Sequence, residues 1–209
     1  MTREPAPDCG LCPRLAEFRR TNALEYPEFA NRPVPSFGDA KGRLLIVGLA
    51  PGLKGANRTG RPFTGDFAGD LLYQTLLDFG FAIGTYRADP GDGLRLADCM
   101  ITNAVRCVPP QNKPTGEEAA TCRQFLAATI TAQSEARVIV ALGRIAHDNV
   151  LSAVGARKAA HKFAHGAAHD IGKGRRLIDS YHCSRYNTNT GVLTPAMFAD
   201  VFAKAKALL

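Results

Sequence analysis

Side chains that could bind a ligand or assist a reaction follow several short apolar segments of this 209-residue chain. One apolar segment leads into a loop, residues 48–66, with five glycines, the aromatic Phe63 and the acid Asp66. Asn103 ends a second apolar segment, and His182 follows another. Glycine lets backbone approach a ligand, an amide offers a donor and an acceptor, and carboxylate and imidazole groups position water and stabilise charge. These residue types predict a ligand pocket with catalytic potential.

The loop 48–66 lacks the signatures of two common nucleotide sites. No Gly-Lys-Ser/Thr follows its glycines, which excludes a Walker loop, and the dinucleotide pattern G-x-G-x-x-G is absent. A glycine-rich loop between a strand and a helix is nevertheless where open α/β sheets bind ligands. The loop therefore predicts a site of a different kind.

Six cysteines suggest a second kind of chemistry. Cys9 and Cys12 form a C-x2-C pair, and Cys107 and Cys122 flank a proline-rich loop. In a cytosolic chain such cysteines indicate metal binding or catalysis before disulfides. Two pairs can converge on one four-thiolate site for zinc or an iron–sulfur cluster, and the spacing does not choose between them. The alternative is that Cys107 and Cys122 are small buried hydrophobes, as we expect for Cys99.

The charge balance favours a polyanionic partner. There are 26 Lys and Arg against 19 Asp and Glu, a net charge of +7, and the pI is about 9.3. Nucleic acid is the first class of partner that such a balance indicates. No Arg-rich run is present, so the charge must be spread over a folded face. The apolar runs are too short to span a bilayer and the N-terminus has no apolar signal core, which predicts a cytoplasmic protein.

Strand-like and helix-like segments alternate along the chain and predict an α/β fold. We expect a single domain over residues 1–209, with three αβα layers around a central four-stranded, mostly parallel sheet. Residues 1–40 should wrap round it and bring Cys9 and Cys12 to the other cysteine pair. In a parallel sheet the loops after the strands share one edge, so the pocket residues should meet there. The expected strands are 43–47, 99–107, 137–142 and 176–181, the helices 67–79, 115–133, 145–154 and 195–209, and the loops 82–98 and 182–194.

Three segments, in order, resemble motifs of the uracil-DNA glycosylase superfamily. Residues 48–66, GLAPGLKGANRTGRPFTGD, resemble the first motif of the type B (family five) enzymes. Residues 181–194, YHCSRYNTNTGVLT, resemble the second motif, whose superfamily form begins His-Pro-Ser. TNAVRCVPP resembles the strand with the base-reading Asn, and the cysteine pattern resembles the iron–sulfur ligands of families four and five. Two residues differ from the family pattern. Gly52 stands where family five more usually has Ala, and this change could alter the width of the pocket and the range of bases accepted. Cys183 replaces the Pro of the second motif, which affects the rigidity of that loop.

The resemblance implies a monofunctional enzyme that flips uracil out of DNA and hydrolyses its glycosidic bond, leaving an abasic site. No lysine in these loops is an obvious Schiff-base nucleophile, so no strand cleavage is expected. The resemblance further implies activity on hypoxanthine or xanthine, a monomer, and a structural [4Fe–4S] cluster on Cys9, Cys12, Cys107 and Cys122. The implied catalytic residues are Asp66, Asn103 and His182. The implied base contacts are Gly48, Leu49, Gly52, Phe63 and Asn103. The implied DNA contacts are Asn57, Arg58, Ser184, Arg185, Tyr186 and Asn187.

Simpler interpretations exist for these residues. Phe63 could be a core aromatic, Asp66 a helix N-cap, and the loop 182–194 a solvated turn. His161, His165 and His169 recur every four residues like a metal-binding helix face, but Gly166 argues against a continuous helix, so no metal is predicted there. Two other functions stay open: a non-catalytic module that binds uracil-containing or abasic DNA with a structural cysteine–metal site, and an unrelated nucleotide-processing enzyme with zinc.

Overall fold

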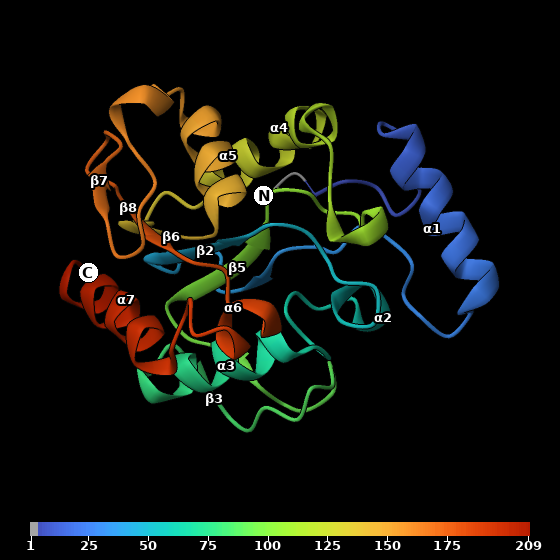
Figure 1. Cartoon of the computed structure of the whole chain (residues 1–209), viewed down its shortest axis with the longest axis horizontal. Helices are drawn as coiled ribbons and strands as arrows, with labels where there is room; N and C mark the ends of the chain where they lie inside the picture. The colour runs from blue at the N-terminus through green and yellow to red at the C-terminus, as the bar shows by residue number, and fades with distance from the viewer. Residues whose placement is uncertain (1–3) are drawn as a thin grey trace.

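The computed structural model describes residues 4–209 and shows a mixed α/β fold (Figure 1). Apart from α1, the longer helices and the central strands fall where the apolar periodicity places them. The helices are α1 Pro13–Glu25, α2 Ala56–Thr59, α3 Phe67–Asp78, α4 Gly116–Ala132, α5 Arg144–Val154, α6 Arg185–Asn189 and α7 Pro195–Ala207, with 3-10 turns η1 Pro110–Asn112 and η2 Lys158–Ala160. The strands are β1 Phe37–Gly38, β2 Leu44–Gly48, β3 Ala82–Ile83, β4 Arg95–Leu96, β5 Cys99–Asn103, β6 Val138–Leu142, β7 Ala168–Asp170 and β8 Arg176–Ser180.

Within the described residues the main sheet has six strands in the order β1-β5-β2-β6-β8-β7. The predicted strand count of four is wrong: β5, β2, β6 and β8 form the parallel centre, and β1 and β7 add antiparallel edges. The edge strands were missed because two or three residues give no readable alternation. The predicted loop 82–98 likewise contains the short β3–β4 pair.

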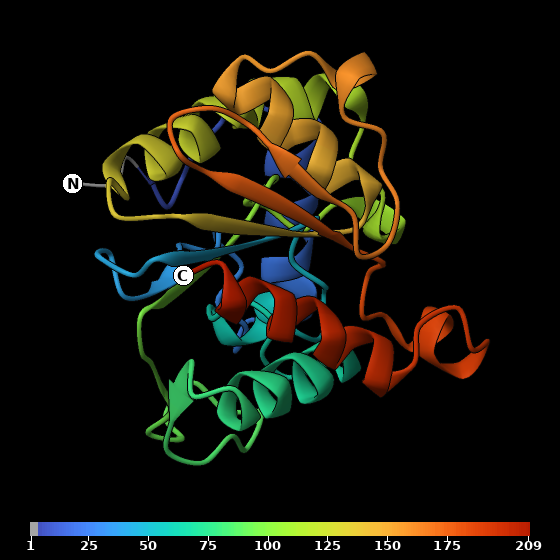
Figure 2. The ribbon, with the colours of Figure 1, turned by 90° about the vertical axis from the view of Figure 1, so that its left-hand side faces the viewer.

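The sheet lies between two helical layers, as predicted (Figure 2). One apolar cluster joins it to α3 and α7, and another joins it to α4 and α5. Every residue of β2, β5 and β6 is buried, which is why these strands read as continuous apolar runs rather than alternating ones. Both faces of the central strands are thereby covered, and the carboxyl ends of the parallel strands remain available for a site.

Helix starts are set by side-chain caps. The Thr115 hydroxyl accepts a hydrogen bond from the Glu118 N–H while the Glu118 carboxylate accepts one from the Thr115 N–H, the capping box that opens α4. Thr194 caps α7, which has a proline in its first turn. These signals are local, so the sequence locates these starts closely.

Most of the N-terminal segment packs beside the sheet, and only its last residues join the sheet as β1. Arg14 of α1 forms a salt bridge with Glu118 of α4, and Leu15 packs in an apolar cluster with Cys107 and Cys122. Cys9 and Cys12 pack against this same cluster. The expected approach of the two cysteine pairs is confirmed. The helix α1 was not predicted, because its apolar residues do not form a clear stripe.

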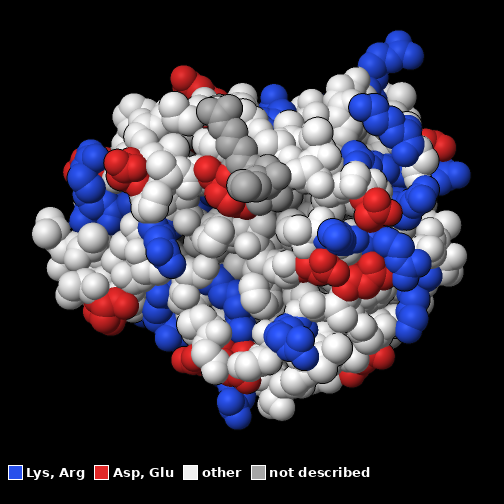
Figure 3. All heavy atoms as spheres, turned by 180° about the vertical axis from the view of Figure 1, so that it is seen from behind, with Lys and Arg blue, Asp and Glu red and all other residues white. Residues whose placement is uncertain are grey.

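The face opposite to that of Figure 1 carries Lys and Arg side chains interspersed with Asp and Glu (Figure 3). Blue side chains gather most along the edge on which β7 and α7 lie. The net positive charge is therefore spread over the folded surface, as the absence of a basic run predicts. Among the helices of residues 4–209, none is both long enough and apolar enough to cross a membrane.

Candidate active site

A cavity of about 630 Å³ opens where β2, β5 and β8 end. Loops from three strands meet there, as the shared edge of a parallel sheet requires. The predicted residues that line it are Leu49, Gly52, Phe63, Asp66, Asn103, His182, Ser184 and Arg185. Lining residues that were not predicted include Lys54 and Asn112. A volume of this size is ordinary for a site that binds a small planar group.

Phe63 forms one wall of the cavity. Its side chain is 7% exposed and its ring centroid lies 6.1 Å from that of His182, with the ring planes 29° apart. A Cβ on Gly48 would lie 2.6 Å from the Phe63 ring and 2.4 Å from Asn103 Oδ1. Only glycine at position 48 therefore allows the aromatic ring and the amide to approach each other. Phe63 also belongs to the apolar core, as the simpler interpretation of this residue predicts.

The backbone of Phe63 is held in an unusual conformation. Its φ of 52° lies in the left-handed region, which costs energy for a residue with a side chain. The Tyr86 hydroxyl donates to the Phe63 carbonyl at 3.2 Å and accepts from the Gly65 N–H at 3.4 Å. Tyr86 also stacks on Tyr73, with ring centroids 4.6 Å apart. Tyr86, which lies in the segment read as a loop, is therefore a positioning residue that sequence reasoning missed.

We predict that Tyr86→Phe lowers kcat/KM about 2- to 10-fold on a uracil-containing oligonucleotide, the substrate that the sequence resemblance implies, because one hydrogen bond of ordinary strength is lost. The fold should persist because the aromatic stacking on Tyr73 remains. Steady-state kinetics with thermal unfolding would check this. Tyr26→Phe, which removes a hydroxyl away from the cavity, should leave kcat/KM unchanged; an equal loss in both variants would contradict the role of Tyr86.

Asn103 places an amide at the end of β5, directly opposite Gly48 in the β2–β5 register. Its side chain is 2% exposed, and its Oδ1 has no hydrogen-bond partner among residues 4–209. A buried polar atom without a partner costs free energy, which a ligand donor would recover. The amide is thus positioned to read a hydrogen-bonding edge in the cavity.

His182 stands beside Phe63 on the loop after β8. Burial lowers the pKa of His182 to about 4, so the imidazole is neutral at physiological pH. Asn187 Nδ2 donates to the His182 carbonyl at 2.8 Å and fixes the backbone of this residue. A neutral imidazole carries one N–H, which can stabilise negative charge without transferring its only proton.

Asp66 is both a helix cap and a cavity residue. Its Oδ1 accepts from the Gly69 N–H at 3.2 Å and caps α3, while Oδ2 faces the glycines of the loop. A Cβ on Gly55 would lie 2.1 Å from Oδ2, and one on Gly52 would lie 3.1 Å away. Burial raises the pKa of Asp66, and the backbone hydrogen bonds only partly offset this effect. The predicted cap is confirmed, and the same carboxylate also lines the cavity.

We predict an acidic limb in the pH profile of kcat that belongs to Asp66. Because burial raises its pKa, the charged form is present above that pKa and is lost as the pH falls through it. Asp66→Asn should keep the cap through Oδ1 but lower kcat at least tenfold and remove this limb. Asp66→Ala should in addition cost about 1 kcal/mol of stability through the lost cap. An unchanged limb in Asp66→Asn would assign the titration to another group.

A family model described as "Uracil DNA glycosylase superfamily" matches residues 35–206. The chain belongs to the uracil-DNA glycosylase superfamily. A type-5 uracil-DNA glycosylase of Thermus thermophilus is 48% identical over 205 residues, 96% of this chain and 93% of that protein. One from Mycobacterium bovis is 43% identical over 208 residues, covering 96% and 78% of the two chains. A type-4 enzyme of Thermotoga maritima is 31% identical over 202 residues, covering 96% and 89%. These identities place the chain in the type-5 group.

The second motif of this superfamily member forms a short helix, α6, rather than the expected loop. Ser184 caps it by accepting from the Asn187 N–H, and Tyr186 projects with 75% of its surface exposed. Cys183 stands where the superfamily has Pro. Its side chain is fully buried and its thiol donates to the Ala68 carbonyl at 3.5 Å. This contact ties the loop to α3 and answers the question of rigidity raised by the substitution.

Two residues of the first motif, residues 48–66, that were predicted to contact DNA have different surroundings. Arg58 is exposed, and its Nε donates to the Lys54 carbonyl at 2.9 Å. Asn57 is fully buried and its Nδ2 donates to Asn31 Oδ1 at 2.9 Å, so a DNA contact by this side chain would require the loop to move. Its amide joins the N-terminal segment to the loop. The sequence could not show this, because the partner lies 26 residues away.

Lys54 and Asn112 were missed as cavity residues. Lys54 lies in the first motif, where its positive charge was a usable signal. Asn112 lies in η1 between the second pair of cysteines, and its φ of 57° is left-handed. The direction of an Asn side chain in such a left-handed turn cannot be predicted from the spacing of residues in the sequence. The cysteine loop therefore contributes to the cavity wall.

The four cysteines predicted as ligands line one small cavity beside Leu15 and Phe125. Burial, and to a lesser extent the neighbouring thiols, raise the pKa of Cys12 to about 11 and that of Cys107 to about 12. The thiols are near enough to influence one another's protonation. The backbone N–H of Arg106 donates to Cys122 Sγ at 3.3 Å, a hydrogen bond that also suits a bound thiolate. The side chain of Arg19 donates to the Cys9 carbonyl and fixes the first pair.

Proposed function

We propose that this chain is a monofunctional DNA glycosylase that flips uracil out of DNA and hydrolyses its glycosidic bond. The observation that carries the proposal is the convergence, in one cavity, of the Phe63 ring, the neutral His182 imidazole and the Asn103 amide, whose Oδ1 has no partner in the described residues. An aromatic wall, a donor–acceptor pair and a preplaced donor are what a flipped base requires. The names of the type-5 relatives support the same conclusion.

Phe63 and Asn103 would bind the base. The ring would stack on one face of the flipped base, and an aromatic face supplies apolar contact of matching shape. The Asn103 amide would pair with the polar edge, where Oδ1 accepts a base N–H and so gains the partner that the described part of the chain does not supply. Gly48 admits both groups because it has no side chain.

His182 and Asp66 would assist bond cleavage. The bond between the sugar and the base breaks with its electron pair going to the base, and the sugar becomes a cation. His182 donates its N–H to the base oxygen on which negative charge develops. Asp66 balances the sugar cation and positions the water that adds to it, whose proton is released. The products are the free base and an abasic site.

The surface beside the cavity would hold the DNA. Tyr186 and Arg185 would enter the space that the flipped base leaves, since both are exposed beside the cavity. Ser184 and Arg58 would contact phosphates. Asn187 would act first through the His182 carbonyl, which it already binds, and a phosphate contact would be additional.

We further propose a [4Fe–4S] cluster on Cys9, Cys12, Cys107 and Cys122. One zinc ion with thiolate ligands holds sulfur atoms about 3.8 Å apart. Among residues 4–209, no three cysteine sulfurs lie within 4.8 Å of one another, and all six cysteines are free thiols. A cluster spaces its ligands more widely, so the donor set fits it better than zinc. The cluster would supply structural cross-linking between the N-terminal segment and the loop after β5.

The proposal also covers the range of bases removed, the oligomeric state and the cellular location. Hypoxanthine and xanthine would be additional substrates, because Gly52 leaves room on the Asp66 side of the cavity. A monomeric, cytoplasmic protein would suffice for the reaction, since every group named above belongs to one chain.

An oligonucleotide with a single uracil tests the proposal. The expected product appears as strand breakage only after alkali, because hydrolysis leaves an intact but alkali-labile abasic strand. Breakage before alkali would contradict the monofunctional assignment. Binding without any alkali-labile product would favour the non-catalytic module instead. Matched oligonucleotides with hypoxanthine or xanthine would measure the wider base range.

A further inference from the structure

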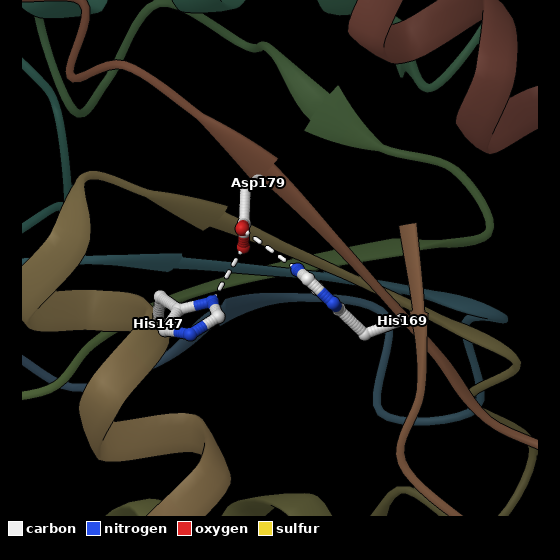
Figure 4. Close-up of side chains that lie close together, drawn as sticks. All are labelled: His147, His169 and Asp179. Carbon is white, nitrogen blue, oxygen red and sulfur yellow. Dashed lines mark hydrogen bonds and ion pairs between the residues drawn. The ribbon is translucent and has the colours of Figure 1, made fainter. Parts of the chain in front are cut away.

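Four of the five histidines of the chain lie together away from the cavity, between α5 and the β7–β8 edge. Within this group His147 of α5 and His169 of β7 both face Asp179 of β8 (Figure 4). One ligand atom from each of these residues lies within 4.8 Å of the others. None of them lines the cavity described above. The cluster therefore needs an explanation of its own.

Each carboxylate oxygen of Asp179 faces one imidazole. His147 Nδ1 lies 2.6 Å from Oδ1 and His169 Nε2 lies 2.9 Å from Oδ2. The side chain of Asp179 is 0% exposed, that of His147 is 1% and that of His169 is 12%. In the described part of the chain, no Lys or Arg forms an ion pair with Asp179. A buried carboxylate needs a cationic partner, so positive charge must be supplied at the imidazole nitrogens.

The other nitrogen of His147 limits the choices. Nε2 lies 2.9 Å from the carbonyl oxygen of His161, and a carbonyl only accepts, so the ring proton belongs on Nε2. In a neutral ring the lone pair of Nδ1 then points at the carboxylate, which is repulsive unless a second proton or a metal ion lies between them. A ligating histidine whose other N–H donates to a backbone carbonyl is a usual arrangement in metal sites.

We propose that His147 Nδ1, His169 Nε2 and the Asp179 carboxylate bind a divalent cation of the zinc type. Two imidazoles and a carboxylate are a donor set that suits zinc, with water completing the coordination. Tetrahedral zinc spaces such ligands about 3.3 Å apart, so the present separations need to open only slightly. The Ala164 N–H donates to Asp179 Oδ2 at 3.2 Å and would orient the carboxylate.

The neighbouring histidines have other roles. The ring nitrogens of His161 lie 2.9 Å and 3.0 Å from the carbonyl oxygens of Arg157 and Asp170, so its ring is not a ligand. His165 Nδ1 accepts from the Tyr181 N–H. The geometry thus pairs His169 with His147, from a helix distant in sequence, as metal ligands. The evenly spaced histidines 161, 165 and 169 do not form the site together. A bound ion would cross-link α5, β7 and β8, three residues before His182.

Zinc binding to the full-length protein tests the site, with His169→Gln as the variant and His165→Gln as the matched control. After equilibration with zinc and removal of the excess, elemental analysis should find one zinc more per chain in the wild type and in His165→Gln than in His169→Gln. Zinc held by the cysteines is common to all three proteins and cancels. Zinc should also raise the melting temperature of the first two proteins but not of His169→Gln.

Imidazole NMR of the wild type provides a test that needs no variant. With zinc present, the ring nitrogens assigned to His147 and His169 should show metal coordination at Nδ1 and Nε2 respectively. Two protons on the His147 ring in the presence of zinc would overturn the proposal and identify the cluster as a protonated hydrogen-bonded network. Equal zinc content in the wild type and in folded His169→Gln would overturn it as well.

Discussion

His182→Ala should lower kcat for uracil release about 10²- to 10³-fold, the usual cost of removing one donor to a developing anion. Burial keeps the imidazole neutral, with a pKa of about 4, so its N–H is present throughout the physiological range. The loss should therefore be nearly constant from pH 6 to pH 9. Single-turnover kinetics would measure it, because they separate bond cleavage from product release.

The fold offers a clear control for this variant. Within residues 4–209 the His182 ring forms no hydrogen bond, and burial alone accounts for its lowered pKa. Its removal should leave the melting temperature within a few degrees of the wild type, and binding to uracil-containing DNA should persist. If His182→Ala unfolds or keeps full activity, the residue is structural and the proposed stabilisation of the base anion fails.

The parallel core could be predicted from sequence because its signals are local. Apolar runs such as 44–47 and 138–142 have one interpretation once helices alternate with them. The edge strands β1 and β7 could not be predicted, because strands of two or three residues form only through pairing with a neighbouring strand. Helix α1 was missed for a related reason: it is held by Arg14 and by the cysteine cluster, not by an apolar stripe.

Some residues of the candidate site could likewise be predicted from the sequence, and others could not. Phe63, Asn103 and His182 could be placed because each follows a strand at the shared edge of the sheet. Tyr86 could not, because its contact with the Phe63 carbonyl spans 23 residues and depends on a left-handed turn. The burial of Asn57 could not be predicted either, since a polar residue in a loop looks exposed until its partner is known. Sequence spacing reveals which groups share an edge, whereas side-chain direction depends on tertiary contacts.

The cysteine cavity leads to the second large prediction, that Cys122→Ala abolishes cluster binding and lowers the melting temperature by about 10 °C or more. Cys122 lies on α4, and its thiol accepts from the Arg106 N–H. Loss of this ligand would detach α4 from the N-terminal pair, whose position depends on the same cavity. Iron and acid-labile sulfide content, visible absorption and thermal unfolding would be measured together.

Cys99→Ala is the matched control for this experiment. Cys99 is fully buried in β5 and does not line the cysteine cavity, so its replacement should keep iron content and colour and cost only a modest cavity penalty. Because Asn112 in the loop between Cys107 and Cys122 reaches the active-site cavity, Cys122→Ala should also weaken binding of uracil-containing DNA. Equal iron content in Cys122→Ala and Cys99→Ala would contradict the cluster assignment. A colourless wild type with one zinc bound to these cysteines would replace it with a zinc site.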